Sequence, residues 1–174
     1  VFTSHRYEDA WDLIGFDDGK IHAAIPILID EFDALRTAPS SYTTSDFPYV
    51  LSAGERRSFS ANTIIRNPSW RKKDIDGALA IGTHDATALG VQDGDRIRLT
   101  TAAGTAVPVI VIDEAMQPGH SSLPNGYGLS YPDEHGEHHT VGVAPNELTS
   151  LDWKDAIAGT PWHKHVPARL ERLA

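Results

Sequence analysis

Apolar positions recur along this chain with two different periods. Between residues 25 and 36 they fall on one face of a helix, with acidic residues on the other face, which predicts a helix from Ile25 to Arg36. From residue 47 onwards the apolar residues form short runs bounded by Gly, Pro and Asn, a pattern typical of strands. The predicted strands are Phe47–Ala53, Ala78–Ile81, Arg96–Thr101, Thr105–Asp113 and a closing strand within Trp162–Leu173.

Two short helices are predicted among these strands. The first covers one or two turns after Thr83, which is a plausible N-cap, and ends at Gly90 in the left-handed conformation. The second is expected over residues 152–158, before Gly159 and Pro161. The run from Val107 to Ile112 is apolar enough to be buried on both faces. The pattern as a whole indicates a compact β-rich barrel core and not a Rossmann-type sheet.

A segment rich in Ser, Thr and Pro, residues 37–46, separates the first helix from the strands. We therefore expect residues 1–46 to form a linker or arm with one helix, and residues 47–174 to form the folded domain. The chain of 174 residues begins at Val1, which leads us to expect a fragment of a longer protein whose native N-terminus is missing. We expect a cytoplasmic location.

Composition narrows the possible functions. The chain contains no cysteine, which excludes disulfides, iron–sulfur ligation and thiolate chemistry within it. A net charge of −9 argues against nucleic-acid binding, and no apolar run approaches the roughly 18 residues that span a membrane.

One part of this acidic chain is basic. Arginines and lysines crowd residues 56–73, directly after a predicted strand that ends in Gly54. A glycine permits close backbone approach and arginine offers a planar fork of donors, so this stretch is a candidate for binding a phosphate or a polar heterocycle. Charge alone favours a different interpretation, in which the basic residues form a solvated face paired with acidic neighbours.

Histidines and acids gather in residues 129–143, which are predicted to form a surface excursion. Imidazole and carboxylate groups are suitable ligands for a divalent metal. Their spacing matches no known closed site, so the sequence favours solvated histidines, and we predict no metal site. The residues concerned are Asp133, Glu134, His135, Glu137, His138 and His139.

Five ordered segments resemble one known family. They are FPYVLSAGERR followed by SFSANT, DATALGVQDGDRIRLTTAAGTAVPVIV, QPGHSSLPNGYG, PNELT and GTPWHKHVPARLERL. Together they resemble the C-terminal molybdopterin-dinucleotide-binding domain of the molybdopterin oxidoreductase (DMSO reductase) family. The earlier segment DGKIHAAIPILIDEFDAL is similar to the connection that leads into this domain. The resemblance implies a mainly β fold with short helices, a six-stranded double-psi β-barrel.

The resemblance also implies a cofactor, bis(molybdopterin guanine dinucleotide) with molybdenum or tungsten, whose protein metal ligand lies outside this chain. Glu55 stands where many relatives have arginine, which leaves open whether Arg56 or Arg57 meets the phosphate. The residues carried over as cofactor contacts are Gly54, Arg56, Arg57, Ser58, Phe59, Ser60, Asn62, Thr63, Asn125, Gly126, Tyr127, Asn146 and Lys164.

Further expectations follow from the same resemblance. The partners would be the remaining domains of the oxidoreductase and electron-transfer subunits, and the isolated chain would be catalytically inactive. The segment ERRSFSANTIIRNPSWRK is similar to formate-dehydrogenase-like members. Two alternatives use the same barrel. One is a substrate- or peptide-binding module without pterin, which would lack the tail from Asn146 to Leu173; the other is a decarboxylase that cleaves itself at a Gly-Ser bond, and this chain has no such pair.

Overall fold

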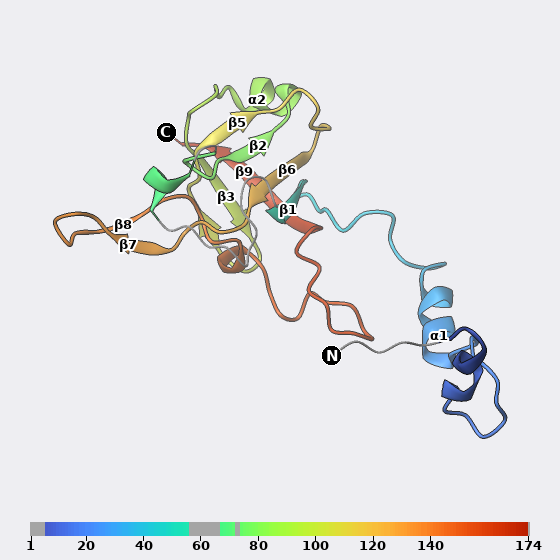
Figure 1. Cartoon of the computed structure of the whole chain (residues 1–174). Helices are drawn as coiled ribbons and strands as arrows, with labels where there is room; N and C mark the ends of the chain where they lie inside the picture. The colour runs from blue at the N-terminus through green and yellow to red at the C-terminus, as the bar shows by residue number, and fades with distance from the viewer. Residues whose placement is uncertain (1–5, 56–66, 72–73, 174) are drawn as a thin grey trace. The chain divides into compact units, whose positions relative to one another are not determined.

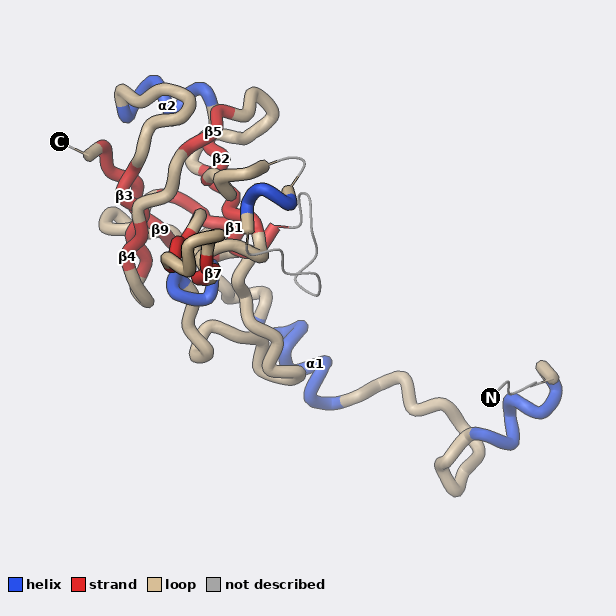
Figure 2. Tube along the Cα trace, turned by 60° about the vertical axis from the view of Figure 1, so that its left-hand side comes forward, coloured by secondary structure: helices blue, strands red, loops and turns tan. Residues whose placement is uncertain are grey.

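The computed structural model describes residues 6–55, 67–71 and 74–173 (Figures 1 and 2). It divides into two compact units, Val1–Pro39 and Ser40–Ala174, and each is described here by itself. Along the described residues the elements are η1 (Glu8–Leu13), α1 (Pro26–Ala34), β1 (Tyr49–Glu55), η2 (Pro68–Trp70), β2 (Leu79–Ile81), α2 (Thr83–Leu89), β3 (Ile97–Thr101), β4 (Thr105–Ala106), β5 (Ile110–Ile112), β6 (His120–Pro124), β7 (Ser130–Pro132), β8 (His138–Thr140), η3 (Pro145–Leu148) and β9 (Val166–Arg172).

The first unit contains the predicted helix, α1. Pro26 occupies its first turn, where a missing N–H costs no helical hydrogen bond, and Ile25 precedes it in an extended conformation. The helix ends at Ala34, slightly before the predicted Arg36. Its apolar side chains are exposed, including Phe32 at 72%.

The second unit is built on a seven-stranded mixed sheet with the order β4-β3-β9-β1-β6-β2-β5. The pairs β1–β6 and β2–β5 are parallel, and the other pairs are antiparallel. The prediction of a mainly β protein with short helices is therefore confirmed. The paired strands have an open order and not that of a closed barrel, so the six-stranded double-psi barrel is not established. An isolated antiparallel bridge joins Arg96, just before β3, to Val109, just before β5.

The core lies within this sheet and under α2. Leu51 of β1, Leu79 of β2 and Leu123 of β6 are fully buried. Strand β3 alternates as predicted, with Ile97 and Leu99 buried and the residue between them exposed. This alternation fixes the register of β3 against β9, because a slip of one residue would turn the apolar side chains toward solvent.

Two local predictions are wrong. Thr83 is the first residue of α2 and not its N-cap, which is Gly82, although Gly90 ends the helix with φ 66° as predicted. The run from Val107 to Ile112 is not buried on both faces: Val107 is 39% exposed, and Ile112 is half-buried. Strand β5 is the last strand in the sheet order, and on its other side it has only the short backbone contacts of Ile110 with Gly94 and Asp95 among the described residues.

The helix predicted over residues 152–158 is also absent, and this segment forms turns. The Asp155 carboxylate accepts backbone N–H bonds from Ile157 at 3.1 Å, Ala158 at 2.7 Å and Thr160 at 2.6 Å. These bonds, with the one from Ala158 first, lower the pKa of Asp155. An aspartate that binds the N–H groups of the following residues competes with the helical hydrogen bonds. This competition explains why helix propensity alone gave a wrong prediction for this segment.

Candidate functional site

Three segments that carry predicted site residues meet at one edge of the sheet (Figure 1). Strands β1 and β6 are parallel neighbours, so their carboxyl ends at Glu55 and Pro124, and the loop that follows Pro124, lie at the same edge. Strand β9 runs antiparallel to β1, and its start at Val166 pairs with Leu51. Lys164, two residues before β9, therefore lies beside the same edge.

Gly54 interrupts the pairing of β1 with β6 at this edge. The register shifts between Ala53 and Glu55, and Gly54 has φ +82°. A Cβ at this position would lie 2.7 Å from Oδ1 of Asn125, closer than real side-chain contacts allow. A bulge of this kind leaves one residue out of the ladder, so its carbonyl can bind elsewhere.

The Gly54 carbonyl binds two of the predicted side chains. Asn125 Nδ2 donates to it at 2.7 Å, and Lys164 Nζ donates to it at 2.9 Å. These residues are 71 and 110 positions from Gly54 in the sequence. An ammonium group has three donors, and this bond uses one of them. The bond therefore fixes the Lys164 ammonium in position while its side chain remains exposed.

Two cavities adjoin this cluster. The larger, about 550 Å³, is lined by Gly54, Asn125, Asn146 and His163 among others. The smaller, about 260 Å³, is lined by Gly126 and Tyr127 and shares Asn125 and Asn146 with the larger. Residues predicted from three separate segments, Gly54, Asn125 and Asn146, thus border one hollow.

Arg71 supports the second predicted loop. Its Nη2 donates to the Gly126 carbonyl at 2.7 Å, and its guanidinium lies 3.6 Å from the centre of the Tyr127 ring. Tyr127 in turn donates its hydroxyl hydrogen bond to the Asp74 carbonyl. Burial lowers the pKa of Arg71, which is 6% exposed. Arg71 and Tyr127 are therefore packed within the protein, and no sequence pattern indicates that this member of the basic cluster braces the loop.

Seven predicted contacts cannot be placed in this geometry because they lie outside the described residues. They are Arg56, Arg57, Ser58, Phe59, Ser60, Asn62 and Thr63.

The short helix η3, which carries Asn146, is held by contacts that sequence reasoning missed. This helix ends at Leu148, and the buried Thr101 donates its Oγ1 hydrogen to the Leu148 carbonyl at 2.9 Å. Thr101 Oγ1 also accepts from the Gly104 N–H at 3.3 Å. A Cβ on Gly104 would meet the Glu147 carbonyl oxygen at 2.4 Å, so only glycine allows this approach.

We expect Thr101→Val to destabilise the protein by about 1–3 kcal/mol, because valine keeps the shape but leaves buried backbone groups without the hydroxyl. Urea unfolding measures this loss. The matched control is Thr105→Val, since Thr105 is exposed and its hydroxyl binds only the Thr100 hydroxyl among the described residues. Equal losses in the two variants would show that the Thr101 hydroxyl does not hold η3.

Comparison with known proteins identifies the class. The family model described as the "Molydopterin dinucleotide binding domain" matches residues 49–167, and the chain belongs to this family. The predicted cofactor class, a molybdopterin with molybdenum or tungsten, is therefore confirmed.

Two relatives are found at low identity. The chain is 22% identical over 157 residues to a tetrathionate reductase subunit from Salmonella typhimurium, covering 79% of this chain and 15% of that protein. It is also similar in fold to acetylene hydratase from Pelobacter acetylenicus, with a TM-score of 0.58 and 17% identity over 78% of this chain and 21% of that one. The chain thus spans about 15% of the curated relative's length. Neither relative is named as a formate dehydrogenase, so that finer resemblance stays a prediction.

The described residues fit such a cofactor. A pyrophosphate needs cationic and N–H donors, and pterin edges need paired donors and acceptors. The Lys164 ammonium and the Asn125 and Asn146 amides supply these groups, and the missing side chain of Gly54 leaves room for Asn125 to lie against the backbone. Among the described residues no helix is long and apolar enough to cross a membrane.

Proposed function

We propose that residues 47–174 hold a bis(molybdopterin guanine dinucleotide) cofactor at the edge where β1, β6 and β9 meet, as one domain of a larger oxidoreductase. The observation that carries this proposal is the shared Gly54 carbonyl, which brings Asn125 and Lys164 together beside the cavity that Asn146 lines. When bound, the cofactor supplies the metal-centred redox chemistry. The work of this chain is to bind and orient it.

Each group has a proposed part in binding. Lys164 and the arginines at positions 56 and 57 would neutralise the pyrophosphate, since charge-assisted hydrogen bonds to phosphate are the strongest available. Asn125 and Asn146 would each offer one amide as donor and acceptor to a heterocycle edge. Ser58, Ser60, Asn62 and Thr63 would add neutral hydrogen bonds, and Phe59 an apolar face. Gly126 would allow close approach, and Tyr127, held by Arg71, would keep its loop in place.

The proposal extends to the rest of the protein. Residues 1–46 would connect this domain to others of the same oxidoreductase, which would supply the metal ligand and the contacts to electron-transfer subunits. We expect no turnover by the 174 residues alone. We also propose that the sheet belongs to the double-psi barrel class; the Arg96–Val109 bridge supports this, because it links the segments that precede β3 and β5.

An amide-resolved NMR titration of the 174-residue chain tests the binding proposal. Guanosine diphosphate is the probe, because it carries the guanine and pyrophosphate groups of the cofactor. We expect shifts at residues 54–63, 125–127, 146 and 164, and smaller shifts with inorganic pyrophosphate. Shifts confined to another face, or none at millimolar ligand, would contradict a site in which this chain binds the dinucleotide part by itself.

A further inference from the structure

The β7–β8 hairpin extends away from the seven-stranded sheet and forms a two-stranded sheet of its own (Figure 1). Tyr131 pairs with His139, and Pro132 pairs with His138. All residues of β8 are exposed. An isolated two-stranded hairpin is marginally stable in water, so something besides a core must hold it.

Asp133 holds the turn of this hairpin. One carboxylate oxygen accepts from the N–H groups of His135 at 2.8 Å and Glu137 at 2.9 Å. The other accepts from Nε2 of His139 at 2.8 Å, and this bond is the main reason that the pKa of Asp133 is lowered. These three hydrogen bonds fix the direction of the carboxylate.

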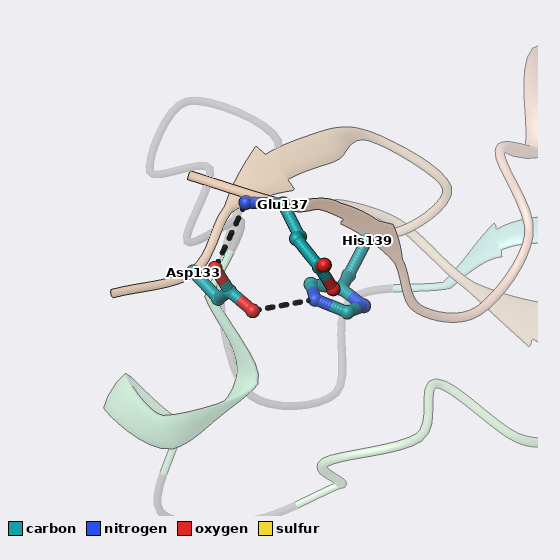
Figure 3. A group of neighbouring side chains, drawn as sticks. All are labelled: Asp133, Glu137 and His139. Atoms are coloured by element: carbon teal, nitrogen blue, oxygen red, sulfur yellow. Dashed lines mark hydrogen bonds and ion pairs between the residues drawn. The ribbon is translucent and has the colours of Figure 1, made fainter. Parts of the chain in front are cut away.

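Three metal-ligating groups converge at this turn. One ligand atom each from Asp133, Glu137 and His139 lie within 4.8 Å of one another, and Figure 3 shows the side chains on one side of the hairpin. Around a tetrahedral zinc ion, with ligand distances near 2.1 Å, neighbouring ligand atoms are about 3.4 Å apart. Asp133 and His139 are already closer than that, and the exposed Glu137 can rotate inward.

The local charge favours a cation. Residues 129–144 contain three acids and no lysine or arginine. Two carboxylates and one neutral imidazole balance the charge of a divalent ion, and this mixed N/O set suits zinc and its neighbours better than calcium or magnesium. The ion would take the place of the proton on Nε2 of His139, and water would complete its coordination.

We propose that the β7–β8 turn binds one divalent ion of the zinc class through Asp133, Glu137 and His139. The ion braces the hairpin by tying the start of its turn to strand β8. The base of the hairpin, at Leu129 and Ala144, lines the smaller cavity described above. The bound ion therefore stiffens the chain between the loop at 125–127 and Asn146, whether or not a cofactor binds there.

Isothermal titration of the 174-residue chain with zinc chloride tests this site. The protein is prepared without a polyhistidine tag and freed of metal with a chelator. We expect one ion per chain, and a loss of affinity of at least about tenfold in Glu137→Gln and in His139→Ala. Both variants keep the Asp133 carboxylate that accepts the turn's backbone hydrogen bonds, so the hairpin can still form.

The control is His138→Ala, since His138 is the adjacent histidine and its Nδ1 binds Ser130 at 2.8 Å instead of the cluster. Its affinity for zinc should stay within about threefold of the wild type. In NMR spectra, zinc should shift the ring nitrogens of His139 more than those of His138. No binding at millimolar zinc would overturn the proposal. Equal weakening by the His138 and His139 variants, or binding removed only by His163→Ala, would also overturn it.

Discussion

Gly128→Ala is expected to lower the free energy of unfolding by about 3–5 kcal/mol, or to prevent folding altogether. Gly128 has φ +75°, and a Cβ there would lie 2.1 Å from the Ala144 nitrogen and 2.7 Å from the Val143 carbonyl carbon. Both obstacles are backbone atoms, which cannot rotate away. The clash is relieved only if the chain on one side of the hairpin's base moves. This movement would distort the smaller cavity, which Asn125 and Asn146 line.

The matched control is Gly126→Ala. Gly126 lies in the same loop with φ +86°, but a Cβ there meets nothing within 4 Å. Alanine at this position bears only the cost of the left-handed backbone, about 1–2 kcal/mol. Urea unfolding of both variants separates backbone strain from steric exclusion. If the two lose the same stability, the close approach of Gly128 to Ala144 is not what holds the loops together.

Local periodicity predicted much of the fold. The alternation in β3, the helix α1 and the left-handed Gly90 each depend on residues within a few positions, which a single sequence displays. The failures also have local causes that periodicity does not capture. Asp155 binds the backbone N–H groups that a helix would use, and Val107 lies just before the last strand of the sheet order, whose position depends on strands elsewhere.

The site was predictable as a set of residues but not as a geometry. Resemblance to the family placed Gly54, Asn125 and Lys164 in separate loops, and no sequence pattern indicates that one carbonyl joins them across 71 and 110 positions. The contact of both side chains with the Gly54 carbonyl depends on the bulge in β1 and on which strands pair with β1. The geometry of the hairpin cluster was equally hidden: the spacing of Asp133, Glu137 and His139 matches no known motif, and only the turn brings them together.

The clustering of basic residues in the sequence indicated the binding groups less well than the positions of these residues in the fold. The sequence grouped Arg71 with neighbouring basic residues as one patch, yet its guanidinium is buried against Tyr127 and donates to the Gly126 carbonyl. Lys164 lies far from that patch in the sequence, and its ammonium donates to the carbonyl of Gly54, which lines the larger cavity. A cation's part in binding therefore depends on what its side chain already contacts, which composition does not reveal.

Because the Arg71 side chain is buried and that of Lys164 is exposed, a substitution of Lys164 tests the binding proposal more directly than one of Arg71. Lys164→Met keeps most of the apolar stem and removes the charge, so we expect affinity for guanosine diphosphate to fall about 10- to 100-fold, the value of a charge-assisted hydrogen bond to phosphate. Lys164→Arg should recover part of the affinity, because guanidinium also binds phosphate. NMR titration or calorimetry measures both.

Two comparisons separate the effect of Lys164→Met on ligand affinity from its effect on the stability of the protein. Lys164→Met also removes a hydrogen bond to the Gly54 carbonyl, which should cost about 1 kcal/mol of stability, so unfolding is measured alongside affinity. Lys154→Met removes an exposed charge from the same tail and should change affinity less than about twofold, since screened surface charges contribute little. Equal weakening by the two methionine variants would indicate diffuse attraction of an anion. An unchanged affinity in Lys164→Met would mean that the lysine serves only to hold the Gly54 bulge, and the phosphate would then have to be bound elsewhere.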